Sequence, residues 1–479
     1  MAKDGITSRE QDYSQWYLDI VDKAELSEWS AVRGCMVIKP HGYAIWELIQ
    51  QGLDQRIKET GHQNAYFPLF IPQSYLMKEA EHVEGFAPEV ALVTHGGGEL
   101  LAEPLVVRPT SETIIGVTFA KWVKSWRDLP LLINQWANVV RWEKRTRPFL
   151  RSTEFLWQEG HTVHADEADA ERETLLILNE VYADFAEKEM ALPVLRGRKS
   201  EREKFPGALR TYAIEAMMQD GRALQAGTSH NLGQNFAKSF EIMFTTPSNE
   251  QAYAWTTSWG ASTRLVGALI MAHSDDDGLV LPPRLAPIQV VVVPIYKNET
   301  ERTAVMEVIA QLTATWRGRF RFKVDDRANL TAGFRFSEWE VKGVPVRVEV
   351  GPKDVQKGSV ALARRDRPGK EGKQFVPQEG LTERIAALME EIQQVLYDRA
   401  LQFQKQNIQE VNDYAAFKQQ VEHGFVRCYW AGTNDDEARV KEETKATIRV
   451  IPFDQPNVEG HCVLTGQPTM QQAIFARSY

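Results

Sequence analysis

Two arginines, a carboxylate and an aromatic residue lie on either side of a cation-rich turn between residues 140 and 155. Arg141 and Glu143 are two positions apart before the turn, and Arg151 and Phe155 are four positions apart after it. Because alternate side chains of a strand point to the same face, two paired strands would gather all four on one sheet surface. Arginine binds phosphate oxygens bidentately, and a phenyl ring can stack on a base, so the pattern indicates a nucleotide site. The alternative is a solvated hairpin with surface ion pairs, but this alternative does not account for four such residues falling on one face.

A second candidate is Arg264, which opens an apolar helix directly after a strand that ends at Gly260. The helix dipole disfavours a cation in the first turn. A functional reason, such as binding a polyphosphate, is therefore indicated. The alternative is an arginine on an exposed helix start.

The elements that would position these residues form a mainly antiparallel sheet with helices. Apolar residues every four positions predict a helix over 42–60, and the proline-bounded segment 65–72 is typical of an edge strand. That pair suits a subunit interface, although a place in the core is the simpler reading. Further predicted elements are a helix over 110–126, a strand over 131–143, a helix over 166–190 and a hairpin around Asp220-Gly221 that joins strands 210–218 and 222–225. With few β-α-β alternations, this indicates an α+β domain over residues 1–285.

The pattern changes after a linker at 274–287, which is rich in aspartate and proline. Alternating strands and helices then predict an α/β module over residues 286–400, with a solvated, basic loop at 364–373. A long helix over 381–405 leads into a third, small region, residues 401–479.

Bulk composition narrows the class of protein. The 479 residues carry a formal charge of −9, so any contact with RNA must rest on local basic clusters. No apolar run is long enough to span a bilayer, and the polar N-terminus has no signal core, so we expect no membrane association. Three dispersed cysteines fit a reducing cytoplasm.

Taken together, the motifs identify a family resemblance. Arg-x-Glu, a loop and Arg-x-x-x-Phe resemble motif 2 of class II aminoacyl-tRNA synthetases; the helix at Arg264 resembles motif 3, and the segment from Gly42 to Phe70 resembles the dimer-forming motif 1. The stretches 108–112, 157–162 and 225–230 are similar to the corresponding stretches of prolyl-tRNA synthetases. The resemblance to that family runs essentially from one end of the chain to the other. The resemblance implies a class II antiparallel-sheet catalytic domain, an α/β anticodon-binding domain and a small α/β C-terminal domain. It also implies a cytoplasmic homodimer that ligates L-proline to tRNA(Pro) with ATP, through prolyl-adenylate.

The resemblance also assigns site residues. The proline pocket would comprise Thr110, Glu112, Arg141, Trp157, His161, His230, Ser258 and Gly260. ATP, with Mg²⁺, would be held by Arg141, Glu143, Arg151, Phe155, Gln225, Thr228 and Arg264. Arg141 and Arg264 would be the catalytic residues. Glu340, Arg347 and Lys353 would read the anticodon.

Two departures from many relatives are expected. The positions of a four-cysteine zinc site fall on Ala431, Asp436, Cys462 and Thr465, and one thiolate cannot make a structural zinc site. We therefore expect no metal there. Between Arg151 and Gln225 there is room for one long helix and part of a hairpin, so an inserted editing domain would not fit, and mischarged alanine would not be cleared in cis.

Two other function classes stay open at this point. A regulatory paralogue could keep the fold without charging tRNA, although the presence of all the motif residues disfavours it. A serine hydrolase would use His95-Gly96-Gly97-Gly98 with Ser229, but the Gly-x-Ser-x-Gly pattern is missed because Asn231 ends it. His161 and His164 do not indicate a metal site, since a spacing of three puts them on opposite faces of a strand.

Overall fold

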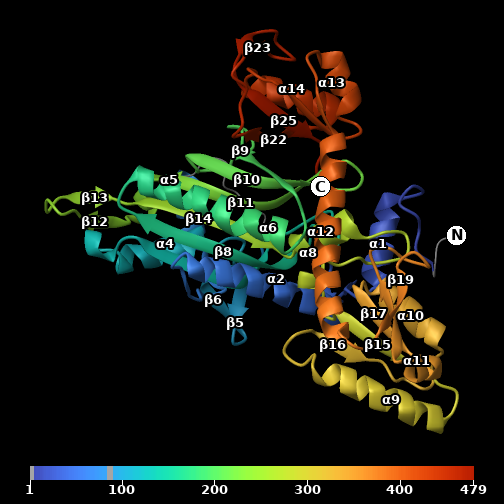
Figure 1. Cartoon of the computed structure of the whole chain (residues 1–479). Coiled ribbons are helices and arrows are strands. Elements are labelled where there is room, and N and C mark those ends of the chain that lie inside the picture. Colours follow the sequence, from blue (N-terminus) through green and yellow to red (C-terminus); the bar gives the residue numbers. More distant parts are fainter. Residues whose placement is uncertain (1–4, 83–89) are drawn as a thin grey trace.

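The computed structural model describes residues 5–82 and 90–479, and its central feature is one eleven-stranded sheet (Figure 1). Six antiparallel neighbours form its central part: β9 (Val194–Arg198), β10 (Arg210–Met217), β11 (Ala223–Gly233), β14 (Trp255–Ser262), β8 (Glu154–His164) and β7 (Leu131–Val140). The short β3 (Gln63–Asn64) adds in parallel to β7. The predicted antiparallel sheet is thereby confirmed.

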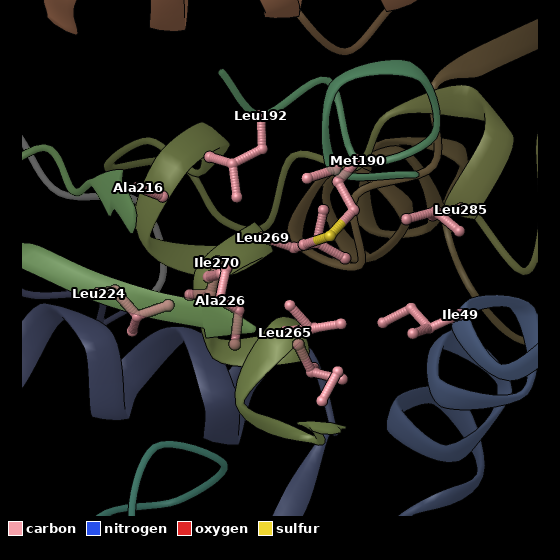
Figure 2. Close-up of a cluster of buried hydrophobic side chains, with 14 of the residues drawn as sticks. Ile49, Met190, Leu192, Ala216, Leu224, Ala226, Leu265, Leu269, Ile270 and Leu285 are labelled. Carbon is pink, nitrogen blue, oxygen red and sulfur yellow. The ribbon is translucent and has the colours of Figure 1, made fainter. Parts of the chain in front are cut away.

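Helices cover one face of this sheet. They are α2 (Pro40–Glu59), α5 (Glu167–Leu176), which continues through a π-helical segment (Ile177–Ala183) into α6 (Asp184–Lys188), and α8 (Arg264–His273). α1 (Tyr13–Lys23) packs beside α8. Figure 2 shows Leu265, Leu269 and Ile270 of α8 near Leu224 and Ala226 of β11 in one apolar cluster. The predicted helix starting after Asp166 is confirmed, since the Asp166 carboxylate accepts from the Asp169 N–H.

Two smaller helices and a small sheet cover part of the opposite face. The helices α4 (Glu112–Trp122) and α7 (Asn235–Phe240) pack over β7 and β8 around Phe119 and Phe236. The small sheet has the order β4-β6-β5, with bounds Phe70–Pro72, Glu99–Val107 and Leu92–Gly96. The proline-bearing β4 lies at an edge, as predicted. The remaining small elements are β1 (Ser27–Trp29), β2 (Met36–Ile38), α3 (Gln73–His82), a 3-10 turn (Trp126–Asp128), β12 (Met243–Thr245) and β13 (Gln251–Tyr253).

The strands around the cation-rich turn are shorter than predicted. β7 ends at Val140, whose N–H donates to the Arg108 carbonyl, and β8 begins only at Glu154, although the Arg141 N–H still donates to the Thr153 carbonyl. Arg141, Glu143 and Arg151 therefore lie in the connecting loop, and the strand register predicted for them is wrong. The helix predicted over 110–126 also ends earlier, at Trp122.

The segment predicted to be a linker is largely buried. Leu279, Val280 and Leu281 belong to the core, and a short 3-10 turn covers Pro283–Leu285. Asp275 accepts two hydrogen bonds from the Arg365 guanidinium, at 2.6 and 2.7 Å. The loop 364–373 is correspondingly not solvated at its start, where Arg364, Arg365 and Asp366 are all buried. Tertiary ion pairs, which composition does not reveal, override both predictions.

The second module is a five-stranded sheet of order β16-β15-β17-β18-β19 (Figure 1). The strands are Phe322–Val324, Val290–Pro294, Val346–Val350, Ser359–Arg364 and Lys373–Pro377. Its helices are α9 (Glu299–Ala314), α10 (Ala332–Val341), α11 (Pro352–Lys357) and α12 (Leu381–Gln406). The predicted α/β character is confirmed; β19 and α11 were not predicted.

Removing the Asp275 carboxylate with Asp275→Ala is expected to lower the free energy of unfolding by about 3 kcal/mol, because the buried Arg365 would lose its counter-charge. Glu390→Ala breaks an ion pair between Arg284 and α12 whose acid is mostly exposed, and should cost less than about 1 kcal/mol. Urea unfolding of both variants measures the difference. Equal losses would contradict the structural role of Asp275.

The C-terminal region extends the eleven-stranded sheet. Its elements are β20 (Ile408–Glu410), α13 (Tyr414–Gln420), β21 (Phe425–Tyr429), α14 (Asn434–Thr444), β22 (Thr447–Pro452), β23 (Gly460–His461), β24 (Pro468–Thr469) and β25 (Gln472–Ala476). β22 pairs with β9, and Gly197 is required there because a Cβ would lie 2.3 Å from the Ile451 carbonyl oxygen. In Figure 1, α12 runs from the second module up to this region. Within residues 5–82 and 90–479, no helix is long and apolar enough to cross a membrane.

Candidate active site

A cavity of about 350 Å³ opens on the sheet face opposite α5 and α8. Every residue predicted for the proline pocket lines it: Thr110, Glu112, Arg141, Trp157, His161, His230, Ser258 and Gly260. Of the residues predicted for ATP, five line it: Arg141, which belongs to both sets, and Phe155, Gln225, Thr228 and Arg264. Glu143 and Arg151 do not line it. They form an ion pair at 3.5 Å in the loop that carries Arg141.

Arg141 lies between the two ends of the cavity. Its guanidinium carbon is 5.6 Å from the Phe155 ring centroid and 5.3 Å from that of Trp157, and its Nε donates to the Pro109 carbonyl at 3.0 Å. Phe155, Trp157, Glu159 and His161 alternate along β8, which places all four on the cavity face. The side chains thus converge as expected, with the loop rather than a strand carrying Arg141.

One end of the cavity is acidic. The Thr110 hydroxyl donates to Glu112, and Glu159 accepts from Ser111 Oγ at 2.5 Å and Gln135 Nε2 at 2.8 Å. His161 Nε2 lies 3.0 Å from the Glu159 carboxylate. Glu159 was not assigned a role from the sequence, although its two-residue spacing from His161 on a strand could have revealed it.

The two histidines at this end have pKa values shifted in opposite directions. Burial opposes protonation of His161, but the hydrogen bond and charge of Glu159 outweigh it and raise the His161 pKa above 6.5. Burial also opposes ionisation of Glu159, yet His161 and the hydrogen bonds from Ser111 and Gln135 lower its pKa below 4.5. Burial, aided by the charge of His161, lowers the pKa of His230 to about 3, so His230 stays neutral.

These pKa shifts define the pH range in which the His161–Glu159 pair stabilises the folded protein. The raised His161 pKa gives stability that is present below about pH 6.5 and lost as pH rises through the folded value; the lowered Glu159 pKa gives stability lost as pH falls below 4.5. Glu159→Gln should therefore destabilise most between these limits, by about 3 kcal/mol, and less at pH 9. Urea unfolding across pH measures this. Glu154→Gln, at the exposed start of the same strand, is the control, and a pH-independent cost for Glu159→Gln would contradict the pairing.

The other end of the cavity is cationic. Arg264 opens α8, and its Nε donates to the Leu150 carbonyl at 3.2 Å. Burial lowers its pKa to about 10, with Arg151 acting in the same direction, so it stays charged at neutral pH. Lys199, which was not predicted, also lines the cavity. Ser258 Oγ and Trp157 Nε1 are buried without a hydrogen-bond partner among the described residues, and can bond to a ligand.

Comparison with known proteins decides the family. The class II tRNA synthetase core model for the G, H, P, S and T enzymes matches residues 99–273, an anticodon-binding domain matches 289–388, and the C-terminal domain of prolyl-tRNA synthetase matches 414–479. A proline–tRNA ligase from Roseiflexus sp. (strain RS-1) is 72% identical, with 100% of both chains covered. This chain belongs to the prolyl-tRNA synthetase family. A second member, the proline–tRNA ligase of Chlorobaculum tepidum, is 58% identical, with 99% of this chain and 100% of that one covered.

A crystal structure of prolyl-tRNA synthetase from Cryptosporidium parvum, complexed with halofuginone and AMPPNP, has the same fold. The two chains are 42% identical and superpose with a TM-score of 0.93, over 99% of each. The class II architecture with an anticodon-binding and a C-terminal domain, inferred from the motifs, is confirmed for this family member.

In the second module, the structure brings together two of the three residues predicted to read the anticodon. Arg347 pairs with Glu340 at 2.7 Å and with Glu349 at 3.0 Å, and its guanidinium lies 4.3 Å from the Phe336 ring centroid. Lys353 lies apart from them, exposed in the first turn of α11. Arg347 must therefore exchange carboxylates for any base that it reads.

The hydrolase hypothesis finds no geometric support. Ser229 is fully buried and its hydroxyl donates to the Thr174 carbonyl at 2.8 Å, away from the cavity. His95 lies in the exposed β5–β6 hairpin. His164 also points away from the cavity, bonding to Asp169 at 2.7 Å, which agrees with the predicted separation from His161.

Proposed function

We propose that this cavity ligates L-proline to tRNA(Pro) at the expense of ATP, with prolyl-adenylate as the intermediate. The observation that carries the proposal is the charge division of the cavity: Glu112 and Glu159 at one end, Arg264 and Lys199 at the other, and Arg141 between them. A cationic amine fits the first end and a polyphosphate the second. The family membership and the proline–tRNA ligases at 72% and 58% identity support this assignment.

The acidic end recognises proline. Glu159 is balanced by protonated His161, which leaves the Glu112 carboxylate to accept from the charged ring nitrogen. Trp157 supplies an apolar wall for the ring, and neutral His230 adds no competing charge. Ser258 and Gly260 form the floor, where the unpaired Ser258 hydroxyl can bond to the substrate.

The cationic end recognises ATP. Phe155 and Arg264 take the two faces of adenine, and Gln225 and Thr228 contribute neutral oxygen atoms at the phosphates. Mg²⁺ would arrive on the triphosphate, for which such oxygens are suitable second ligands. Glu143, which pairs with Arg151 in the loop next to the cavity, would accept from the exocyclic amine of the base.

Chemistry follows from position and charge. The proline carboxylate attacks the α-phosphorus and pyrophosphate leaves; the ribose hydroxyl of tRNA then attacks the adenylate carbonyl and AMP leaves. The carboxylate is already ionised, so the first step requires no general base. Arg141 bridges the carboxylate and the α-phosphate, which aligns them and neutralises charge in the transition state.

The wider assembly is also proposed. The catalytic domain comprises residues 1–285, the anticodon-binding domain 286–400 and the C-terminal domain 401–479, with α12 crossing the last boundary. Glu340, Arg347 and Lys353 recognise anticodon bases of tRNA(Pro). A homodimer is supported by exposed apolar residues around β4, such as Tyr66 and Phe70, and the cytoplasm is the proposed location.

For the C-terminal domain we propose support by packing, without structural zinc. Cys462 lies beside Thr465 and the Ala431 backbone, and among the four positions it alone carries a thiol. Cys428 is buried in the same apolar cluster as Trp430 and Phe475.

Exchange of labelled pyrophosphate into ATP, measured with each of the twenty amino acids, tests the function. We expect exchange with proline and charging of tRNA(Pro). Absence of exchange with any amino acid would overturn the assignment, and exchange without charging would favour the regulatory paralogue.

A further inference from the structure

A buried cluster of charges joins the C-terminal strand β22 to the cationic end of the cavity. The Glu215 carboxylate on β10 accepts from Lys199 Nζ at 2.6 Å and from Arg449 Nη2 at 2.9 Å, with Arg449 Nε 3.3 Å from its second oxygen. All three side chains are at most 8% exposed. Nothing in the chemistry above uses Arg449, which lies in another domain.

A bulge aims Arg449 at this carboxylate. Ile448 pairs with Phe475 and Val450 with the adjacent Ile474, so Arg449 is the extra residue of β22. Its Nη1 is fixed from the far side by the Thr447 hydroxyl at 2.9 Å. Ser478, next to the C-terminus, adds a second hydroxyl at 3.2 Å. Bulges commonly redirect a side chain beside an active site.

A second bulge lies opposite Glu215. Ile214 pairs with Gly227 and Glu215 with Gln225, which leaves Ala226 of β11 without a partner in this ladder. Gln225, which lines the cavity, is thereby set directly beside Glu215. The cluster and the nucleotide end of the cavity consequently share one stretch of sheet.

The cluster carries more positive than negative charge. Lys199 and Arg449 both contact the single Glu215, and the charges of Glu215 and Arg449 also act on Arg264. Glu203, which faces Lys199 from the loop, has its own partner in Lys441 at 3.9 Å. Excess buried cations are stabilised by an anion, and the open cavity beside Lys199 and Arg264 has room for one.

We propose that Arg449 is a positioning residue for ATP: by holding Glu215 it fixes the Lys199 ammonium where the phosphates bind. This inference rests on the proposed function. It makes the C-terminal domain a part of the active site, since the domain supplies one of the groups that set the charge at the nucleotide end. A cluster that served only to attach the domain would affect folding but not ATP selectively.

Steady-state exchange kinetics of Arg449→Met test the proposal. We expect KM for ATP to rise about tenfold, with KM for proline changed by less than about twofold, because loss of one charged contact should act only at the phosphates. Arg449→Lys should recover part of the loss. Arg427→Met is the matched control, since Arg427 binds Gln472 and Asp454 within the C-terminal domain. Unchanged kinetics, or equal rises in both KM values that track a lower Tm, would overturn the inference.

A double-mutant cycle with Lys199→Met is a second test, and a mere loss of stability would not produce its expected result. If Arg449 acts through Lys199, adding Arg449→Met to Lys199→Met should raise KM for ATP by less than about twofold further. Full additivity would contradict the proposal. A wild-type protein without proline-dependent exchange would overturn the proposed function, whereas an active wild type with an indifferent Arg449→Met overturns this inference alone.

Discussion

Arg141→Ala is expected to reduce proline-dependent exchange of pyrophosphate into ATP by about a thousandfold or more, the scale found when a donor to a developing charge is removed. The guanidinium lies between the acidic and cationic ends of the cavity, against Phe155 and Trp157. In the proposed function it bridges the two reacting groups. Arg141→Lys should restore little, because an ammonium cannot bind two oxygen pairs in the planar geometry of guanidinium.

The matched control is Arg145→Ala. Arg145 belongs to the same loop and is exposed. Exchange does not involve tRNA, so this variant should retain exchange within about twofold of wild type, since surface charges contribute little. An Arg141→Ala enzyme with more than about a tenth of wild-type exchange would show that the transition state does not depend on this bridge.

Glu112→Gln is expected to raise KM for proline about 10- to 100-fold and to leave KM for ATP within about twofold, because hydrogen bonds to charged groups contribute about 1.5–3 kcal/mol. The variant keeps the shape of the side chain and its contact with Thr110. What it removes is the charge that we propose pairs with the ring nitrogen of the substrate. Glu159, already balanced by His161, cannot replace it.

Glu103→Gln serves as the control for Glu112→Gln, since Glu103 lies on the exposed strand β6 and accepts from the Ser74 N–H outside the cavity. Its kinetics should match those of wild type. Equal effects of Glu112→Gln on both substrates would mean that Glu112 supports the fold of the cavity rather than recognising proline.

Local signals in the sequence predicted the elements that depend on local physics. The four-residue apolar step predicted α2, the Asp166 cap predicted the start of α5, and Asp220-Gly221 predicted the β10–β11 hairpin. Each depends on contacts within one turn or one hairpin. The motifs built on these elements then brought the predicted cavity residues together.

The errors concern long-range contacts. β7 ends at Val140, whose N–H bonds to the carbonyl of Arg108, 32 residues earlier in the chain, and the linker is buried where Asp275 meets Arg365. Neither partner is visible in a local pattern. The loop nevertheless brings Arg141 close to Phe155, since the Arg141 backbone N–H donates to the Thr153 carbonyl at 2.8 Å.

Buried charges were the least predictable part of the site. Lys199, Glu215 and Arg449 are residue types that are mostly exposed in proteins, and their sequence neighbours suggest ordinary surface charge. Arg449 reaches the other two because β22 pairs with β9 across more than two hundred residues. The sheet that unites two domains, and not the composition of any segment, creates this cluster.

The most direct test of the central claim is a crystal structure of the full chain with a non-hydrolysable prolyl-adenylate analogue. We expect its ring nitrogen on Glu112, its phosphate mimic on Arg141, and its adenine between Phe155 and Arg264. An analogue bound outside this cavity, or inside it with the ring at the cationic end, would contradict the account.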